Sequence, residues 1–510
     1  MLIFSSMDCS WAVYTSDHAG INKGVHANVH AYPDRLVTGT FFLLLMVYGL
    51  IAVPAGLSAD SDSALLMRAA EHWVSTGEYV RSRTSGFPLY EALLAACKLM
   101  GASLLLINGL SLCMAAGVAL IAYRLAGRDH IWRGHLALAL LLTYPLFMIA
   151  SAEPMETMLS VLLAFALVAR TFSCSQLGWS HAGLAVLLVL TRLDAALLVM
   201  ALALASTGNR SVVERYQSLL WLFKVGCIAL LGYVIMNQGF DFLNTKTMGF
   251  DAWWRRLARA LASSVNALQL TGLMALVLWF LHIRRLRANA QSLPFLDRLL
   301  LWSMGLYGLR FLALPDEIFY LIIPVLLLLL RVSMLMRPSA PLIAVFLLTG
   351  CLQSFATLSL FERLPGTEDR IAFRSAASAG PLLQELRARK VFTQLREDSK
   401  RRQIECALFP DCPALSISHS APYLYSADRQ RAAVSARYLY VFFSGRYPRL
   451  IDQGFREIRV CDEEVVPGPA WRIWQPSIQR YLVDVIAAQQ VPKCRTLLLS
   501  GHQVGRKAFN

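Results

Sequence analysis

Long apolar segments separated by short polar connections dominate this chain. A helix that crosses a bilayer needs about 20 largely apolar residues. The segments that approach this length are 36–57, 102–123, 135–151, 155–171, 218–236, 265–283, 296–314, 318–336 and 340–358. A further apolar segment, 181–206, carries Arg192 and Asp194 near its centre. The pattern therefore predicts a polytopic α-helical membrane protein.

Basic residues are concentrated in the polar connections and predict which side each connection faces. Loops rich in Lys and Arg stay on the cytoplasmic side of a membrane. The connections predicted to be cytoplasmic are 124–133, 209–215, 282–287 and 331–338. Residues 1–35 are expected to form a cytoplasmic tail, so residues 58–100 form the first outer loop. Within that loop the periodicity predicts surface helices at 62–76 and 88–100.

The segment 181–206 disturbs the alternation of sides. The turn at 172–180 and the basic loop at 209–215 are both expected inside, although one apolar segment separates them. A hairpin of two short half-helices, 181–190 and 195–206, restores the alternation and carries its tip to the outer side. Charge and non-helical backbone are tolerated at membrane depth where they face protein. The expected total is about 10–11 membrane helices, the hairpin included.

Composition agrees with a membrane protein and narrows its partners. Of 510 residues, 56% are hydrophobic and 16% are charged, and the mean hydropathy is +0.50. These values lie outside the range of soluble domains. Much of the net charge of +15 lies in the polar connections. The lipid bilayer is therefore the expected partner, and nucleic-acid binding is not expected.

The chain becomes more polar after residue 358. A charged helical stretch at 382–402 and strands predicted at 437–443 and 495–501 indicate a small α+β extracytoplasmic domain. Its four cysteines would suit two disulfides in an oxidising compartment. They are Cys406, Cys412, Cys461 and Cys494. The expected organisation is a tail at 1–35, a membrane domain at 36–358 and a C-terminal domain at 359–510.

Asp60 and Asp62 directly follow the first span and are the first candidates for chemistry. One interpretation is structural, because a carboxylate at a helix N-terminus stabilises the helix by about 0.3–1 kcal/mol. The other interpretation is catalytic, because further polar side chains are predicted at the same outer face. These are Glu153, Glu156, Arg192, Asp194, Asn244, Lys246, Arg310, Asp316, Glu317 and Tyr320.

Structural roles are available for several of these side chains as well. Arg192 and Asp194 can form an ion pair with each other, and the Lys246 side chain can extend to the membrane interface. Asp316 and Glu317 can begin a helix. Ionisable groups within a span are nevertheless functional candidates by default, because their burial is costly. Arg192 with Asp194 is the strongest such case.

Stretches in a fixed order carry a resemblance to a known family. They are "DSDSALLMRAAEHWVSTGEYVRSRTSGFPLYE", "EPMET", "LTRLDAALL", "GFDFLNTKTMGF" and "LPDEIFYLIIP", and the resemblance covers most of residues 36–335. Their order and topology resemble bacterial GT-C fold glycosyltransferases of the mannosyl- and arabinosyltransferase type, which are integral-membrane enzymes that use polyprenyl-phosphate sugars. Leu193 and Leu243 stand where the family motifs usually have proline. The resemblance implies a GT-C-like fold, with a base or substrate ligand at Asp60 or Asp62.

The residue types suit this chemistry independently of the family. A sugar hydroxyl must lose a proton as it attacks an anomeric carbon, so Asp60 or Asp62 can act as general base. The leaving lipid phosphate needs cations, and Arg192, Lys246 and Arg310 are the candidates. The other polar side chains are expected to bind substrate: Glu153, Glu156, Asp194, Asn244, Asp316, Glu317 and Tyr320. No cofactor or metal is required, although a divalent metal is compatible with the acidic pair.

The expected function is transfer of a hexose or pentose, with inversion, from a polyprenyl-phosphate donor to an extracytoplasmic glycan, lipid or protein acceptor. The expected location is the bacterial inner membrane, with the active site and the C-terminal domain facing the periplasm. A transporter or lipid flippase is the alternative, because such proteins also use broken helices and charges within spans. Their charges lie near the bilayer midplane, whereas here the charges are predicted at one face.

Overall fold

The computed structural model describes most of residues 31–389 and three short strands beyond them. The gaps within 31–389 are 57, 59–60, 83–85, 174–176, 208–211, 241–252, 290, 314–317, 337–339, 364–370, 384, 387–388. The three strands are 414–417, 457–461 and 494–498. The predicted strand at 437–443 and nearly all of the predicted N-terminal tail lie outside the described residues.

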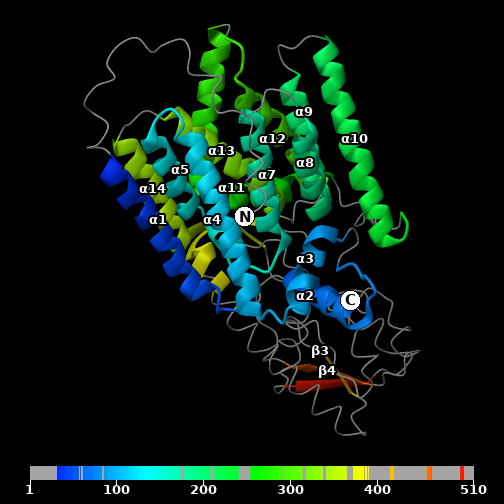
Figure 1. Ribbon diagram of the computed structural model, residues 1–510. Helices are drawn as coiled ribbons and strands as arrows, with labels where there is room; N and C mark the ends of the chain where they lie inside the picture. Colours follow the sequence, from blue (N-terminus) through cyan, green and yellow to red (C-terminus); the bar gives the residue numbers. More distant parts are fainter. Residues whose placement is uncertain are drawn as a thin grey trace.

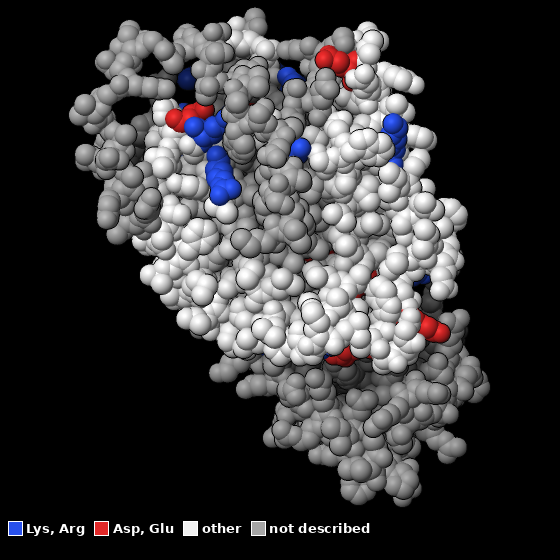
Figure 2. All heavy atoms as spheres, in the orientation of Figure 1, with Lys and Arg blue, Asp and Glu red and all other residues white. Residues whose placement is uncertain are grey.

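The described chain is mostly helical, and several helices are long and apolar enough to span a bilayer. They are α4 (Leu104–Ala126), α7 (Glu156–Ser173), α10 (Val212–Asn237), the part Ala267–Ala288 of α11 (Trp253–Ala288), and Ile318–Leu335, which joins η3 (Ile318–Leu321) to α13 (Ile322–Leu335). Shorter apolar segments lie in α1 (Ala31–Ala52), α5 (Ile131–Thr143) and α14 (Ala340–Phe355). On the face drawn in Figure 2, a broad uncharged band separates charged groups at the two ends. These are the properties of a multi-pass helical membrane protein.

The helices form one bundle in which α13 is central and α10 peripheral (Figure 1). The residues of α13 are buried almost throughout, including Leu326, Leu327 and Leu328. In contrast, α10 exposes large apolar side chains such as Phe223 and Ile235. This exposure suits a helix whose outer face contacts lipid.

Predicted spans differ from the structure at identifiable points. The first span, predicted at 36–57, ends at Ala52, and its helix begins at Ala31, within the tail predicted at 1–35. The span predicted at 135–151 is divided, because α5 ends at Thr143 and α6 (Pro145–Ala150) begins at Pro145. Proline lacks the backbone N–H and disfavours helical geometry in the preceding residue, and Tyr144 has φ −90° and ψ 109°. The span predicted at 340–358 also ends early, since α14 stops at Phe355.

The segment 181–206 is broken into two short helices, as the sequence predicts. They are α8 (Trp179–Thr191) and α9 (Ala196–Ser206), with η1 (Leu193–Ala195) between them. The Trp221 indole N–H donates to the carbonyl of Gly178 at 3.3 Å, and the Tyr233 hydroxyl donates to that of Val189 at 3.0 Å. Going from the first contact to the second, the residue numbers increase in both helices, so α8 runs parallel to α10.

The second half-helix returns to the side where α8 begins. The 26 residues of α10 correspond to about 39 Å, whereas residues 207–211, which join α9 to the start of α10, reach only about 20 Å. If α9 continued in the direction of α8, this connection could not be made. Arg298, near the start of α12 (Phe295–Ala313), donates to the carbonyl of Ala205 at 2.9 Å. The hairpin predicted from the alternation of sides is confirmed.

Two short helices, α2 (Ser61–Thr76) and α3 (Pro88–Leu99), lie at one end of the bundle (Figure 1). We call this the α2–α3 end. Leu66, Ala70, Phe87 and Leu94 form the core between these helices and the bundle. The predicted surface helices at 62–76 and 88–100 are thus confirmed.

The buried carboxylate of Glu91 organises the loop between α2 and α3. It accepts hydrogen bonds from the Tyr79 hydroxyl at 2.5 Å, the backbone N–H of Ser82 at 2.8 Å and that of Phe87 at 3.1 Å. Burial and the Glu91 carboxylate raise the pKa of Tyr79 well above its ordinary value, so the phenol remains a donor at neutral pH. Gly86 has φ +67°, and a Cβ there would lie 2.6 Å from the Tyr79 hydroxyl. The conformation of the loop therefore depends on Glu91 and Gly86.

The Glu91→Gln variant is expected to loosen this loop. Glutamine offers one acceptor oxygen where Glu91 uses two, and an unsatisfied buried group costs about 1–3 kcal/mol. Trypsin should then cleave after Arg81 about tenfold faster or more. The matched control is Glu78→Gln, because Glu78 is exposed in the same loop. Equal cleavage rates in the two variants would contradict the role given to Glu91.

Strands appear after α14. β1 (Ala356–Arg363) and β2 (Ile371–Ala379) pair antiparallel, and β4 (Glu457–Cys461) lies between parallel β3 (Ala414–Ile417) and antiparallel β5 (Cys494–Leu498). β5 overlaps the strand predicted at 495–501. The register places Cys461 opposite Cys494, and opposed residues of antiparallel strands have Cα separations of about 4.5–5.5 Å, within the range of a disulfide. Cys406 and Cys412 lie outside the described residues, and the α+β domain remains a prediction.

Candidate functional site at the α2–α3 end

Arg192 lies at the tip of the helical hairpin and forms a bidentate ion pair with Asp194. The helix α8 ends at Thr191, and Arg192 adopts an extended conformation with φ −150° and ψ 122°. Its Nε donates to Oδ1 of Asp194 at 3.0 Å and its Nη2 to Oδ2 at 3.2 Å. The turn between α8 and α9 therefore directs both side chains toward each other.

A second carboxylate faces the same guanidinium from another helix. Nη1 of Arg192 lies 3.7 Å from Oε1 of Glu156, the first residue of α7. The side chains of Arg192, Glu156 and Asp194 are 6%, 4% and 10% exposed. Two nearly buried carboxylates thus compensate one cation, which supports the structural ion-pair interpretation of Arg192 and adds a partner to it.

The Tyr320 ring connects Arg192 to a second guanidinium. The guanidinium carbon atoms of Arg192 and Arg310 lie 5.2 Å and 5.3 Å from the centre of this ring. Such distances are typical of cation–π contacts. Arg310 is half-buried in the last turn of α12, and within the described residues no carboxylate pairs with it. We call Glu156, Arg192, Asp194, Arg310 and Tyr320 the hairpin-tip cluster.

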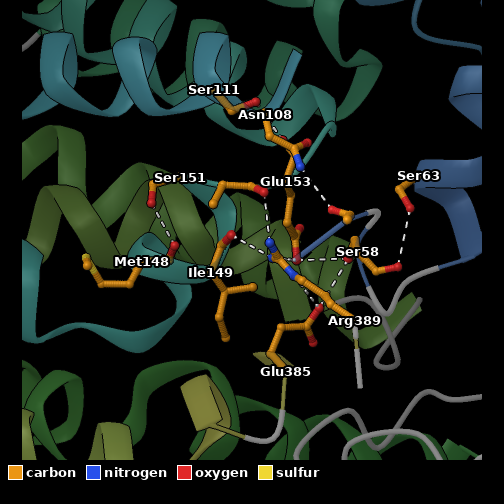
Figure 3. Close-up of polar contacts among 12 residues, drawn as sticks. Ser58, Ser63, Asn108, Ser111, Met148, Ile149, Ser151, Glu153, Glu385 and Arg389 are labelled. Carbon is orange, nitrogen blue, oxygen red and sulfur yellow. Dashed lines mark hydrogen bonds and ion pairs between the residues drawn. The ribbon is translucent and has the colours of Figure 1, made fainter. Parts of the chain in front are cut away.

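Arg389 is fully buried beside the start of α7 (Figure 3). Its Nη2 donates to Oε1 of Glu153 at 2.8 Å and to the carbonyl of Ile149 at 3.0 Å. Its Nη1 donates to the carbonyl of Ala152 at 2.8 Å, and its Nε donates to Oε1 of Glu385 at 3.3 Å. The side chains of Glu153 and Glu385 are 0% and 1% exposed. A cation from the region after α14 is therefore enclosed by carboxylates and carbonyls.

Ser58 links this group to the segment that follows α1 (Figure 3). Its hydroxyl contacts Oε1 of Glu153 at 2.9 Å and Oε1 of Glu385 at 3.3 Å. The Ser63 hydroxyl in turn donates to the Ser58 carbonyl at 3.5 Å. We call Ser58, Glu153, Glu385 and Arg389 the Arg389 cluster.

Side chains of α4 fix the two segments that the Arg389 cluster joins. Nδ2 of Asn108 donates to the carbonyls of Val53 and Gly56 at 3.0 Å and 2.9 Å. The Ser111 hydroxyl donates to the carbonyl of Glu153 at 2.6 Å. These bonds anchor the backbone at Val53, Gly56 and Glu153 to α4.

The structure gathers several of the candidate residues at one end of the bundle. These are Glu153, Glu156, Arg192, Asp194, Arg310 and Tyr320. Others lie outside the described residues: Asp60, Asn244, Lys246, Asp316 and Glu317. Asp62 lies in the first turn of α2, but its side chain also lies outside the described part.

Ser58, Glu385 and Arg389 were not candidates on sequence grounds. The stretch 382–402 was assigned to a separate polar domain, yet Leu382, Leu386 and Arg389 contact the membrane bundle. The available signal was the spacing of the Leu pair at i, i+4 beside a Glu–Arg pair at i, i+4, which predicts one helix with an apolar and a charged contact surface. The partners of Arg389 on the bundle lie 236–240 residues away in the sequence, so spacing alone could not identify these contacts.

A different buried ion pair lies at the opposite end of the bundle. Asp297, near the start of α12, accepts from Arg331 at 2.7 Å and 2.6 Å and from the Trp279 indole at 2.9 Å. Arg331 lies near the end of α13, whereas Tyr320 lies before its start. This pair provides a comparison for the clusters at the α2–α3 end.

The described residues contain no group of three or more His, Cys, Asp or Glu side chains arranged to hold a metal ion. Comparisons of the chain with protein families, with curated proteins and with solved structures found no match.

Proposed function

We propose that this chain is a membrane glycosyltransferase of the GT-C type, which transfers a sugar with inversion from a polyprenyl-phosphate donor to a glycan, lipid or protein acceptor. The observation that supports this proposal is the gathering of charged side chains from α7, the α8–α9 hairpin and α12, together with the Tyr320 ring of η3, at the end where α2 begins. Asp62 lies in the first turn of α2, and Asp60 precedes it in the sequence. The proposal therefore assigns the base to the start of α2 and the phosphate-binding cation to the hairpin-tip cluster.

The proposed chemistry assigns different roles to the two arginines. Arg192 already faces two carboxylates, so its charge is largely compensated and its role is to hold the hairpin tip. Arg310 faces only the Tyr320 ring among the described groups. The planar guanidinium of Arg310 is therefore the preferred ligand for the donor phosphate. Lys246 remains a second candidate cation.

The base acts on the acceptor. Asp60 or Asp62 removes the proton of the acceptor hydroxyl as the hydroxyl oxygen bonds to the anomeric carbon. The bond from that carbon to the phosphate oxygen breaks, and the polyprenyl phosphate leaves as a stable anion. Glu153, Asp194 and Tyr320 are proposed to shape the substrate site around these groups. The site and the C-terminal region are placed on the periplasmic side of a bacterial inner membrane in this proposal.

The α8–α9 hairpin also favours a second candidate function. Broken helices with charged tips occur in transporters, where they bind substrate near the midplane. A transporter or lipid flippase would move substrate across proteoliposomes without forming a glycosidic bond. The charged clusters described above lie at an end of the bundle, which favours transfer over transport.

The deciding experiment supplies purified protein in proteoliposomes with a panel of polyprenyl-phosphate sugars and with cell-envelope acceptors. Mass spectrometry of the products should reveal one added sugar residue per acceptor and release of polyprenyl phosphate. Substrate movement without glycosidic product would instead establish the transporter.

The Arg310→Gln variant is expected to lose transfer while keeping the fold. Loss of one group that stabilises developing negative charge lowers kcat about 10²–10³-fold. Arg310→Lys should recover part of this loss, because it keeps the charge without the bidentate geometry. Arg124→Gln is the control, since Arg124 is an exposed arginine in the last turn of α4. If Arg310→Gln and Arg124→Gln transferred equally well, Arg310 would not be the phosphate ligand.

A further inference from the structure

The Arg389 cluster joins three parts of the chain that are distant in sequence. Ser58 follows α1, Glu153 precedes α7, and Arg389 comes after β2. The sequence separations are 95 residues between Ser58 and Glu153 and 236 between Glu153 and Arg389. Burial of a guanidinium is costly unless it is fully paired and hydrogen-bonded. A simple connection between two parts of a chain does not require a buried guanidinium, so the burial of Arg389 indicates a specific role.

The contacts of Arg389 lead directly to Ser58. Oε1 of Glu153 receives hydrogen bonds from both Arg389 and Ser58, and Oε1 of Glu385 receives hydrogen bonds from the same two residues. Arg389 therefore determines where both acceptors of the Ser58 hydroxyl lie. Without it, two buried carboxylates would repel each other beside Ser58.

Ser58 in turn is close to the proposed base. It precedes Asp60 by two residues, and its carbonyl accepts a hydrogen bond from Ser63 in the first turn of α2. A shift of Ser58 thus moves the start of the helix that carries Asp62. Misplacement of a reacting group by about 1 Å can lower a rate 10²-fold.

We infer that Arg389 is a positioning residue for the proposed transfer: through Glu153, Glu385 and Ser58 it fixes the start of α2, the helix that carries Asp62. The inference rests on the proposed function for its catalytic consequence. It also makes the region after α14 part of the site, because the segment 381–389 must be docked on the bundle for the base to be in place.

The test compares Arg389→Met with Arg331→Met in proteoliposomes of the full chain. Both substitutions remove an arginine from an ion pair with a buried carboxylate, but Arg331 lies at the opposite end of the bundle. Each is combined with Ser63→Cys at a buried position in the first turn of α2, and the rate of labelling at position 63 by a membrane-impermeant maleimide is measured by peptide mass spectrometry. Labelling is expected to become at least about tenfold faster with Arg389→Met. The reason is that the variant lowers the free energy of local opening of this segment by about 1.4 kcal/mol or more. It should not change with Arg331→Met.

The second readout is the kinetics of the single Arg389 and Arg331 variants, measured without the Ser63→Cys substitution. We expect Arg389→Met to lower kcat about 10²-fold per folded molecule, with little change in KM for the donor. Arg389→Lys should recover part of the rate, and it replaces Arg389→Met as the test variant if the latter does not assemble. Arg331→Met should keep kcat per folded molecule.

The outcomes separate the inference from the proposed function. If the wild type transfers sugar, and the Arg389 variants match Arg331→Met in labelling and in kcat, the positioning role is overturned. If the wild type transfers no sugar from any donor while Arg389→Met still accelerates labelling, the proposed function is overturned and the hold of Arg389 on the segment is supported.

Discussion

The Asp60→Asn/Asp62→Asn double variant is expected to transfer sugar about 10²–10⁴-fold more slowly than the wild type, which is the usual contribution of a general base. Asparagine keeps the size of aspartate and remains a good helix N-cap. The start of α2 at Ser61 should therefore survive the substitution, and only the ability to take a proton is lost. Initial rates with a fixed donor and acceptor, measured in proteoliposomes, give the comparison.

The single variants decide between the two carboxylates. The variant of the base should retain almost none of the rate, whereas the other should be affected mainly in KM. Circular dichroism and thermal unfolding in detergent provide the control for folding, since loss of a helix cap by itself appears as lower stability rather than as a lower kcat. Full activity in the double variant would exclude the proposed mechanism.

The Arg192→Met variant is expected to lose about 3–5 kcal/mol of unfolding free energy, because removal of one partner leaves buried charge uncompensated. Here the stranded groups are the carboxylates of Asp194 and Glu156, which come from the hairpin tip and from α7. Repulsion between them should separate these two elements. Chemical unfolding in detergent micelles, followed by circular dichroism, measures the loss.

A surface ion pair provides the matched control. Lys98 lies 2.9 Å from Glu71, and their side chains are 23% and 53% exposed. Lys98→Met is expected to change stability by less than about 1 kcal/mol, since solvent screens exposed pairs. If Arg192→Met proved as stable as Lys98→Met, Arg192 would not organise the hairpin tip. Arg192→Lys should be intermediate, because a single ammonium cannot reproduce the bidentate contact.

Much of the helical architecture follows from the sequence, and the reason is local. Apolar length predicts a span, so α4, α7 and α10 match the predicted segments closely. The hairpin α8–α9 also follows, because the turn at 172–180 and the basic loop at 209–215 are expected on the same side, which permits no single crossing between them. The division of the span at Pro145 was predictable from the proline alone. The residues on both sides of Pro145 are apolar, however, and by apolar length alone they form one continuous span.

The side-chain clusters depend on contacts that no local pattern contains. The Arg192–Asp194 pair lies two residues apart and was a candidate ion pair on sequence grounds. The approach of Glu156 to the same guanidinium requires α7 and α8 to pack antiparallel, as the contact of Arg170 with Ser180 at 3.2 Å shows. The burial of Arg389 is even less predictable from the sequence, because a charged residue beyond the last apolar segment is usually solvated. Its burial results from tertiary packing.

The burial of Arg389 also orders the assembly of the protein in time. Chains emerge from the ribosome N-terminus first, so Glu153 is synthesised and placed at the α2–α3 end well before Arg389 exists. During that interval the carboxylate lacks its principal cation, and the end of the bundle is incomplete. Completion requires the later helices to pack and then the segment after α14 to reach the α2–α3 end. The contact of Arg389 with Glu153 therefore forms only in a chain whose synthesis has passed residue 389.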